Sequence, residues 1–311
     1  MAAKHQHLSN RYIPEEFLDW LTGFIEGDGC FSSHIPKKPS RRKKAHMHRK
    51  GESMHRWVPT PRVQLIIQLG EYAVLYKIKH TLQMGQIRKT SEGYWRYTVS
   101  KKQHIALLIG WLNGRLALEK KHRSFCTWVD VFKQSNLVST ARNLLISVPD
   151  VLPVTSVDLR KAWLSGLIDR EGCFQITLQK SDRYRLGYRT RLRFMIDQKN
   201  ALDSMQQIVC LFKGSVGLRK PSLTHRYAQT TTVHLRPIVD YLKLFPLKTR
   251  KHMLFLRWAK AVEMCVNKQH LTFEGFEQIK KLKHLNMQTV KKAKGVISPS
   301  LQKCVEESNE D

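Results

Sequence analysis

The order of apolar and polar positions repeats along the chain and predicts the same elements twice. An apolar segment over residues 14–27 has the length of a helix and begins with a proline, which suits a first helical turn. Its counterpart covers residues 157–170. Residues 62–69 and residues 188–197 alternate between apolar and polar side chains, which is the period of a strand with one buried face. The pattern therefore predicts a helix followed by strands in each half.

The remaining elements follow in the same order in both halves. The pattern predicts a helix, a hairpin strand after a glycine turn, and more helix, over residues 71–84, 94–100 and 102–133 in the first half and 201–212, 226–235 and 236–268 in the second. The predicted fold class is α+β, with two pseudo-symmetric αββαββα subdomains. The expected organisation is a subdomain over 1–133, a linker over 134–155, a subdomain over 156–275, and a basic, then acidic tail over 276–311.

One motif marks the end of the first predicted helix of each half. Residues 21–29 read Leu-Thr-Gly-Phe-Ile-Glu-Gly-Asp-Gly, residues 164–172 read Leu-Ser-Gly-Leu-Ile-Asp-Arg-Glu-Gly, and Cys-Phe follows both. A single helix that ends in a carboxylate and a glycine is common, because glycine terminates helices. Two copies with matched flanks instead indicate a paired acidic site, formed by Asp28 and Glu171.

The small residues of the motif predict that the two helices pack closely. Gly23 and Gly27 lie four apart on one helix face, and Gly166 lies alike in the second helix. Their backbones can then approach more closely than the usual spacing of about 8–10 Å. The two carboxylates converge, and they repel unless a cation lies between them. Hard oxygen ligands favour Mg²⁺, which can polarise a phosphodiester and activate water.

The duplication extends beyond the motif. Gln198 lies 130 positions after Gln68, and Phe255 lies 130 after Phe125, whereas the motif carboxylates lie 143 apart. The first half therefore carries the difference, about 13 residues, which we place in the basic segment 32–60. The alternation of apolar and polar residues has a different phase relative to Gln68 in the first strand than it has relative to Gln198 in the second. The sequence thus leaves open which face of the first strand meets a ligand.

Composition indicates the class of partner. The 54 lysines and arginines outnumber 25 acidic residues, a formal charge of +29, which favours a long polyanion. A ribosomal or histone-like protein would share this charge but not seven tryptophans and a duplicated acidic motif. No apolar run is long enough to span a bilayer, so we expect no membrane association. The six cysteines form no Cys-x-x-Cys pair, and we expect them to be reduced and mostly buried.

The two motif segments resemble the signature helices of the LAGLIDADG homing endonucleases, in the single-chain form with two motifs. The resemblance covers roughly residues 12–268. It implies that the motif helices form the subdomain interface and that two saddle-shaped antiparallel sheets straddle the DNA major groove. It also implies that Asp28 and Glu171 bind Mg²⁺ or Mn²⁺, assisted by the backbone carbonyls of Gly27 and Arg170, and that each cleaves one strand.

The resemblance further implies catalytic partners for the carboxylates. Gln68 and Gln198 match the water-ordering glutamines of the family. A lysine near the end of each unit completes such sites. The candidates are Lys120 or Lys121, and Lys248 or Lys251, of which we favour Lys121 and Lys251.

One position departs from the family pattern. Arg170 stands where a small residue is usual, opposite Gly27. Its long side chain is expected to swing out from the helix seam or to reach a phosphate.

Charge and period together propose a DNA-binding surface. A basic loop at a sheet edge is expected to order on the phosphate backbone, unless it is simply a solvated loop. Arginines spaced by two along a strand would project together into a groove and could bind guanines. The loop candidates are Lys37, Lys38, Arg41, Arg42, Lys43 and Lys44, and the strand candidates are Arg62, Gln64, Arg88, Arg96, Arg189, Arg191, Arg193 and Arg226.

Three functions compete at this level. The favoured one is a site-specific double-strand DNA endonuclease, intron-encoded and active as a monomer on a long asymmetric site. The alternative is an intron maturase that binds its own intron RNA on the same fold, and a third is a non-catalytic DNA-binding regulator. Because both motif carboxylates are present, we favour the endonuclease. Members of the resembled family are often encoded in a mitochondrion or chloroplast, and we expect an organellar origin here.

Overall fold

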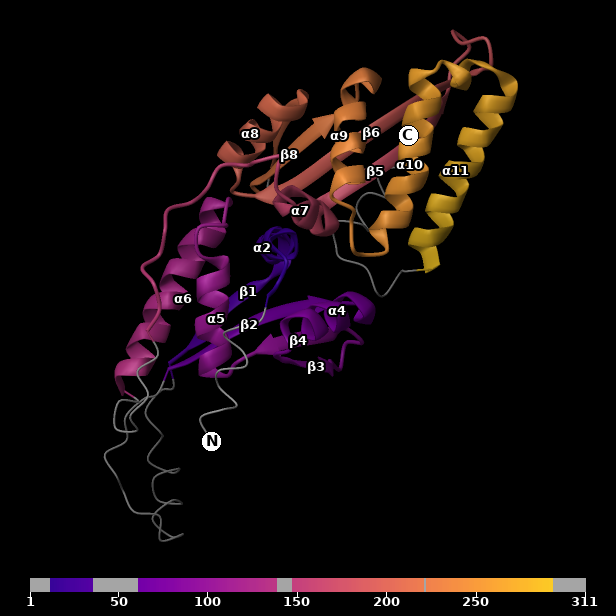
Figure 1. Ribbon diagram of the computed structural model, residues 1–311. Helices are drawn as coiled ribbons and strands as arrows, with labels where there is room; N and C mark the ends of the chain where they lie inside the picture. Colours follow the sequence, from indigo (N-terminus) through magenta and orange to yellow (C-terminus); the bar gives the residue numbers. More distant parts are fainter. Residues whose placement is uncertain (1–11, 36–60, 139–146, 221, 293–311) are drawn as a thin grey trace.

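The computed structural model describes residues 12–35, 61–138, 147–220 and 222–292 (Figure 1). The first half contains α2 (Glu15–Asp28), β1 (Cys30–His34), β2 (Arg62–Leu69), α4 (Tyr72–Leu82), β3 (Gln86–Lys89), β4 (Trp95–Val99), α5 (Lys102–Leu112) and α6 (Glu119–Val138). The second contains α7 (Trp163–Glu171), β5 (Gly172–Lys180), β6 (Tyr188–Lys199), α8 (Leu202–Phe212), β7 (Ser215–Arg219), β8 (Thr224–Gln229), α9 (Thr232–Leu244), α10 (Lys251–Val266) and α11 (Phe273–Lys292). The predicted α+β duplication is confirmed.

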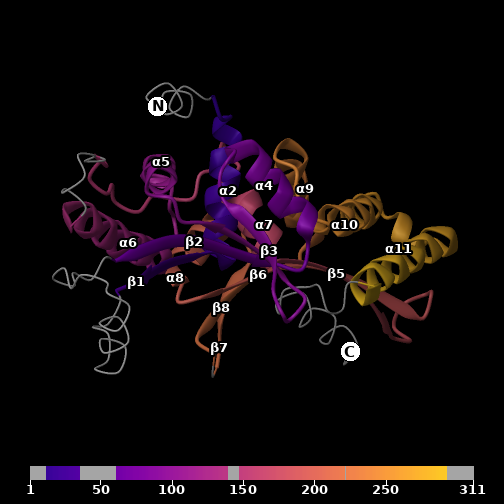
Figure 2. The same ribbon diagram turned by 90° about the horizontal axis from the view of Figure 1, so that it is seen from below.

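Each half is a four-stranded antiparallel sheet with helices on one face. The strand orders are β1-β2-β4-β3 and β5-β6-β8-β7, which are the same topology. On β2, Val63, Leu65 and Ile67 are buried in the N-terminal core, while the residues between them face the open side of the sheet. The motif helices α2 and α7 lie between the two halves in Figure 1, and Figure 2 shows them side by side, seen from below. Among the described residues, the helices cover one face of each sheet, and the opposite face is open.

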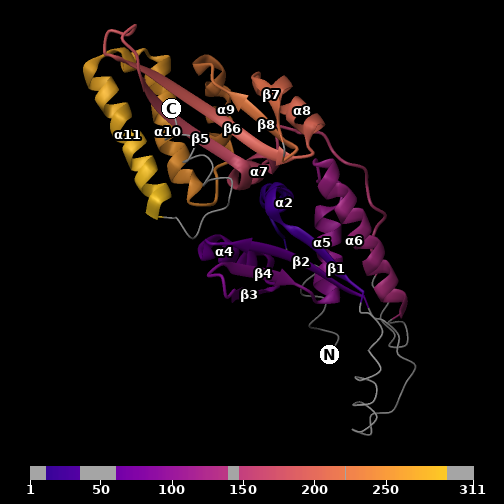
Figure 3. The ribbon, with the colours of Figure 1, turned by 180° about the vertical axis from the view of Figure 1, so that it is seen from behind.

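The two motif helices pack with their backbones in close contact at two glycines. A methyl group added at Gly23 would lie 1.9 Å from the carbonyl oxygen of Trp163, and one added at Gly166 would lie 1.9 Å from that of Trp20. Only glycine fits at these two symmetry-related positions. The close contact predicted from the small residues of the motif is confirmed, and it brings the ends of the two helices together (Figure 3).

Each half ends in two helices, where the sequence pattern predicted one helical segment. In the first half the break falls between α5 and α6, and in the second between α9 and α10. Backbone N–H groups at each break, those of Leu118 and Lys248 among them, donate to a buried carboxylate of a motif helix. A continuous helix would have used these donors internally, so the breaks are a consequence of tertiary packing.

Two predicted boundaries are wrong for local reasons. The second motif helix begins at Trp163 rather than at residue 157, because Asp158 accepts the backbone N–H of Arg160 and holds a turn there. The strand predicted over 226–235 ends at Gln229. The side chain of Gln229 accepts the N–H groups of Thr230 and Thr231, and this turns the chain out of the sheet.

The chain continues past the second half into α11, which packs against α10. Phe276 and Ile279 are buried, and Phe276 stacks on Tyr188 with ring centroids 5.1 Å apart. The expected tail therefore starts inside an ordered helix, and residues 293–311 lie outside the described residues. Within the described residues, no helix is both long and apolar enough to cross a membrane.

The expectation for the cysteines is wrong in two respects. Cys173 is disulfide-bonded rather than reduced. Cys30 and Cys210 are exposed free thiols, so burial holds for Cys265 but not for these two.

Candidate active site

The motif carboxylates end the two helices that cross at the glycines. Asp28 is the last residue of α2, and Glu171 is the last residue of α7. A methyl group on Gly27 would lie 3.6 Å from Cγ of Glu171, so the second carboxylate sits against the end of the first helix. The Asp28 carboxylate also contributes to the upward shift in the pKa of Glu171. The predicted convergence of the two groups is therefore present in the structure.

Arg170 does not swing out from the helix seam. Its side chain is only 4% exposed, and a methyl group on Gly27 would lie 2.5 Å from its Cβ. The guanidinium lies 5.3 Å from the centre of the Phe24 ring and forms an ion pair with the carboxylate of Asp28. Gly27 leaves the room that this side chain fills. The side chain thus crosses from one motif helix to the carboxylate of the other.

One lysine from each half, the half-buried Lys121 and the buried Lys251, contacts the backbone of its motif. Lys251 donates to the carbonyls of Ile168 and Arg170, at 3.0 Å in both cases. Lys121 donates to the carbonyl of Gly29. Lys120 is exposed, and Lys248 instead pairs with Glu16 at 3.6 Å. Of the four lysines considered from the sequence, Lys121 and Lys251 are those that the fold places against the motif.

Burial changes the acid–base properties of this centre. Desolvation raises the pKa of Glu171 to about 7, although Arg170 and Lys251 oppose the shift. Desolvation also lowers the pKa of Lys251 to about 8, and Asp169 and Glu171 oppose that shift. The pKa of Lys121 is lowered by burial as well, against the attraction of Asp28. Groups with such shifts are concentrated at functional sites.

A second pair of motif carboxylates, Glu26 and Asp169, was missed from the sequence. Glu26 accepts the Leu118 N–H at 2.7 Å and the Trp163 indole N–H at 2.5 Å. Asp169 accepts the Lys248 N–H at 2.7 Å and the Trp20 indole N–H at 2.8 Å. Each carboxylate therefore ties its own helix to the opposite one. The signal was present, because each of these acids lies two residues before the motif carboxylate in both copies.

Strand register shows which residue of the second half is equivalent to Gln68. Gln68 pairs with Arg96 across β2 and β4, and Arg96 donates to its side chain at 3.0 Å. In the second half Arg226 pairs with Asp197 and donates to its carboxylate at 2.7 Å. Asp197, not Gln198, therefore occupies the position of Gln68. The alignment made from equal spacing is wrong by one residue.

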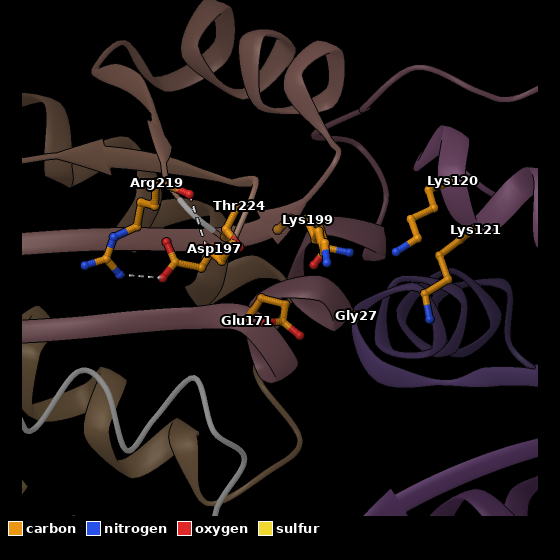
Figure 4. Close-up of a pocket in the computed structure, with 10 residues that line it drawn as sticks. Gly27, Lys120, Lys121, Glu171, Asp197, Lys199, Arg219 and Thr224 are labelled. Atoms are coloured by element: carbon orange, nitrogen blue, oxygen red, sulfur yellow. Dashed lines mark hydrogen bonds and ion pairs between the residues drawn. The ribbon is translucent and has the colours of Figure 1, made fainter.

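A pocket of 320 Å³ lies beside the motif and is lined by residues of both halves, Glu171 and Lys121 among them (Figure 4). Glu171 lies between the Asp197–Arg219 pair on one side and Lys120 and Lys121 on the other. Gln198 lines the same pocket, so its side chain still has access to the site. The full lining is Gly27, Lys120, Lys121, Glu171, Asp197, Gln198, Lys199, Arg219, Ser222 and Thr224.

Seven of the fourteen DNA-binding candidates lie on the open sheet faces. Arg189, Arg191 and Arg193 share one face of β6, because the buried residues alternate with them. Residues Gln64, Arg88 and Arg96 line a hollow of 590 Å³ on the other sheet, and Arg62 is exposed on the same face of β2. Arg226 is the exception, since Asp197 holds its guanidinium. The loop candidates Lys37, Lys38, Arg41, Arg42, Lys43 and Lys44 lie outside the described residues.

Comparison with known proteins agrees with this geometry. The chain matches the family described as "LAGLIDADG endonuclease" over residues 21–132 and 164–262. It is 29% identical over 273 residues to "Probable intron-encoded endonuclease 4" of Neurospora crassa, covering 86% of this chain and 44% of that protein. It is 24% identical over 285 residues to "Uncharacterized cox1 intron-2 37.2 kDa protein" of Schizosaccharomyces pombe, covering 88% and 75%. The chain thus spans less than half of the Neurospora relative.

Solved structures show the same fold. The meganuclease I-SmaMI bound to uncleaveable DNA superposes with a TM-score of 0.67 at 18% identity, over 86% of this chain and 97% of that one. The same meganuclease bound to uncleaved DNA in the presence of calcium ions gives a TM-score of 0.62, also at 18% identity, over 86% and 97%. With a family match over most of the chain and both motifs in place, this protein belongs to the LAGLIDADG endonuclease family.

Proposed function

We propose that this protein is a homing endonuclease that cuts both strands of a long, asymmetric DNA site by metal-dependent hydrolysis. One observation carries the proposal. Asp28 and Glu171 end two helices that cross at glycines, and the ends of these helices lie between two sheets with open, arginine-bearing faces. A duplex laid along those faces would pass its phosphates over the two carboxylates. The named relatives and the DNA-bound structures of the same fold support this function.

The residues present fit a divalent cation. Within the described residues no group of three or more His, Cys, Asp or Glu could hold a metal. Mg²⁺ needs no such cage, because it keeps several waters and binds one or two carboxylates together with substrate phosphates. Asp28 and Glu171 would supply the carboxylates, with the carbonyls of Gly27 and Arg170 beside them. The bound ion would polarise the scissile phosphate and lower the pKa of an attacking water.

The chain's own residues would divide the remaining work. Lys121 and Lys251, held beside the motif, would neutralise charge that develops on the phosphate. Asp197 and Gln68 occupy matching positions and would orient water in the two halves. Gln198 does not occupy the position that matches Gln68, but it lines the pocket and would contact a substrate bound there. The two cleavage sites are then chemically unequal, since one has an amide where the other has a carboxylate.

We also propose that the protein acts as a monomer and is encoded in an organellar intron. One chain already contains both halves, so it would act as a monomer. The relatives are named as products of fungal introns, including one in cox1, which supports an intron in an organellar genome.

Substitution of the motif carboxylates tests the function. Asp28→Asn and Glu171→Gln should each abolish cleavage of a cognate duplex while leaving its affinity within about tenfold, or about 1.4 kcal/mol. The cognate duplex is first selected from a randomised library by sequencing the cut ends. Gel shift in Ca²⁺ measures binding, and gel electrophoresis in Mg²⁺ measures cutting. The exposed variant Asp203→Asn is the control. Full cleavage by either motif variant would refute the assignment.

A further inference from the structure

An aromatic ladder covers the outer face of α4, in the N-terminal half only. Tyr72, Tyr76 and His80 are spaced by four, so they lie along one helix face. Their successive ring centroids are 5.9 and 6.1 Å apart. Trp95 of β4 packs on Tyr72 at 4.8 Å, and the ammonium of Lys89 lies 5.8 Å from the centre of the Trp95 ring. These five residues form the aromatic ladder.

The ladder is accessible. Tyr72 is 44% exposed and Tyr76 is 52% exposed, while His80 and Lys89 are exposed and Trp95 is half-buried. Large apolar rings on a solvated helix face lose the stabilisation that burial would give them. These rings are therefore accessible to a ligand.

The duplication supplies an internal control. The buried residues of α4 and α8 correspond with a constant spacing of 130, as Leu75 and Met205 show. By the same spacing, α8 has Leu202, Gln206 and Cys210 in place of the three ladder residues of α4. Strand register places His225 at the position of Trp95 and Leu218 at that of Lys89. The second half adopts the same fold without the ladder, so the fold does not require it.

The two helices α4 and α8 also differ in charge. α4 carries exposed Lys77 and Lys79 and no acidic residue. α8 carries Asp203 and no basic residue. A helix face with stacked rings and only positive charge fits a polyanion with flat, apolar surfaces better than an apolar protein partner.

The ladder lies on the opposite side of the sheet from the proposed duplex. On β4 the side chain of Trp95 points to the same side as buried Tyr97, whereas Arg96 between them is exposed and bonds to Gln68 on the open face. A duplex bound to the open face would therefore leave the ladder free. Bases inside a duplex are also unable to stack on side chains, so the ladder suits unpaired nucleotides.

We propose that the aromatic ladder of Tyr72, Tyr76, His80, Trp95 and Lys89 is a second nucleic-acid site, which stacks unpaired bases of single-stranded RNA. Sequence-tolerant stacking on tyrosine and tryptophan, with lysines along the backbone, is the usual way in which unpaired strands are held. RNA is the committed ligand because its loops and bulges present unpaired bases, and tyrosine and histidine can also hydrogen-bond to the 2′-hydroxyl. This site goes beyond the proposed DNA cleavage and uses none of its residues.

The test replaces the ladder with the residues that the other half carries. The full-length variant Tyr72→Leu/Tyr76→Gln should fold, because the matching positions of α8 hold those residues. Binding of a fluorescein-labelled, unstructured 15-nucleotide RNA is followed by anisotropy, with saturating cognate duplex present to occupy the open face. The double variant should bind RNA about tenfold more weakly or worse, since each stacked base contributes to affinity. Tyr72→Phe/Tyr76→Phe, which keeps the rings, should retain most of the affinity.

Controls separate this site from the DNA site. Tyr12→Leu removes a tyrosine that is also exposed and should leave RNA binding unchanged. The double variant should cut cognate DNA at the wild-type rate. Unchanged RNA affinity in the double variant, or displacement of RNA by the duplex, would overturn the proposal. Equal affinity for DNA of the same single-stranded sequence would overturn the assignment to RNA. Failure of the wild-type protein to cut DNA would refute only the proposed endonuclease.

Discussion

The guanidinium of Arg170 pairs with the carboxylate of Asp28, across the seam between the two motif helices. Arg170 is buried, whereas the Asp28 side chain is 54% exposed. The pair therefore sits where a cation bound to Asp28 would be placed. Lys121 and Lys251 also lie near the motif, where each donates to a backbone carbonyl. Arg170 therefore competes with a cation for the Asp28 carboxylate.

This pairing predicts that Arg170→Gln binds divalent cations more tightly in the absence of DNA. A unit charge about 4 Å away is worth on the order of 1–4 kcal/mol near a protein surface, so the gain should be about tenfold or more. Titration with Mn²⁺, followed by electron paramagnetic resonance, measures the free ion. Arg160→Gln, which removes an exposed ion pair with Asp158, is the matched control. Equal Mn²⁺ affinity in the Arg170 variant and the wild type would contradict the interpretation.

The helix crossing predicts a large penalty for one added methyl group. Gly166→Ala would place its Cβ against the backbone of Trp20, which can yield only if the helices separate. We expect a loss of about 1–3 kcal/mol or more in unfolding free energy and a disproportionate loss of cleavage. Gly110→Ala is the control, because nothing lies within 4 Å of its added Cβ. Urea denaturation should show the control unchanged or more stable. A stable, active Gly166 variant would show that the crossing is looser than described.

Glu26 predicts a pH dependence of stability. Burial raises its folded-state pKa from 4.5 to about 7, while hydrogen bonds from Ala117, Leu118 and Trp163 oppose the shift. The folded state then holds a proton that the unfolded state releases. This contribution to stability is complete below about pH 4.5 and is lost as pH rises through about 7, on the order of a few kcal/mol. Glu171, also raised to about 7, acts in the same window.

Glu26→Gln should therefore flatten the fall in unfolding free energy between pH 5 and pH 7.5, the two conditions at which urea denaturation is measured. Glu15→Gln, on the exposed side of the same helix, should leave the slope as it is in the wild type. An unchanged slope in the Glu26 variant would mean that this carboxylate stays ionised throughout.

The corrected register predicts which residue of β6 supports cleavage. Asp197→Ala removes the partner of Arg226 at the position of Gln68, and we expect cleavage to fall by about 10²-fold, the lower end for a group that assists proton transfer. Gln198→Ala should change the rate by only a few-fold. Single-turnover cleavage of matched duplexes gives both rates. The reverse order of effects would restore Gln198 to the role inferred from spacing.

The arginines of β6 predict a loss of base preference rather than a general loss of binding. Arg193→Ala should relax the preference at one or two base pairs, at about 1–3 kcal/mol each, because its side chain lies on the open sheet face. Alanine at Arg41, Arg42, Lys43 and Lys44 should instead reduce the salt dependence of binding, with each lost phosphate contact lowering the slope by about 0.9. Binding to a randomised duplex library at several salt concentrations distinguishes them. Exchange of the two effects would show that the loop reads the bases.

Local pattern was sufficient for the order of the elements and for the paired acids, but not for the helix breaks between α5 and α6 and between α9 and α10. The alternation over β2 appears in the structure with its predicted bounds. Every second side chain of a strand faces the same side of the sheet, so burial of one face produces an apolar residue at every second position. The duplicated motif identified Asp28 and Glu171 in the same way, since equivalent positions of a repeated unit fold alike. These features depend on neighbours along the chain, which the sequence displays directly.

Tertiary structure alone decided the partners of the charged groups. Spacing equated Gln198 with Gln68, but cross-strand pairing with Arg226 placed Asp197 there. The pairing of Arg170 with Asp28 depends on contact between residues 142 apart in sequence. No periodicity records which distant group a long side chain meets, because hydrogen-bond geometry and close packing decide it only after the two halves have come together.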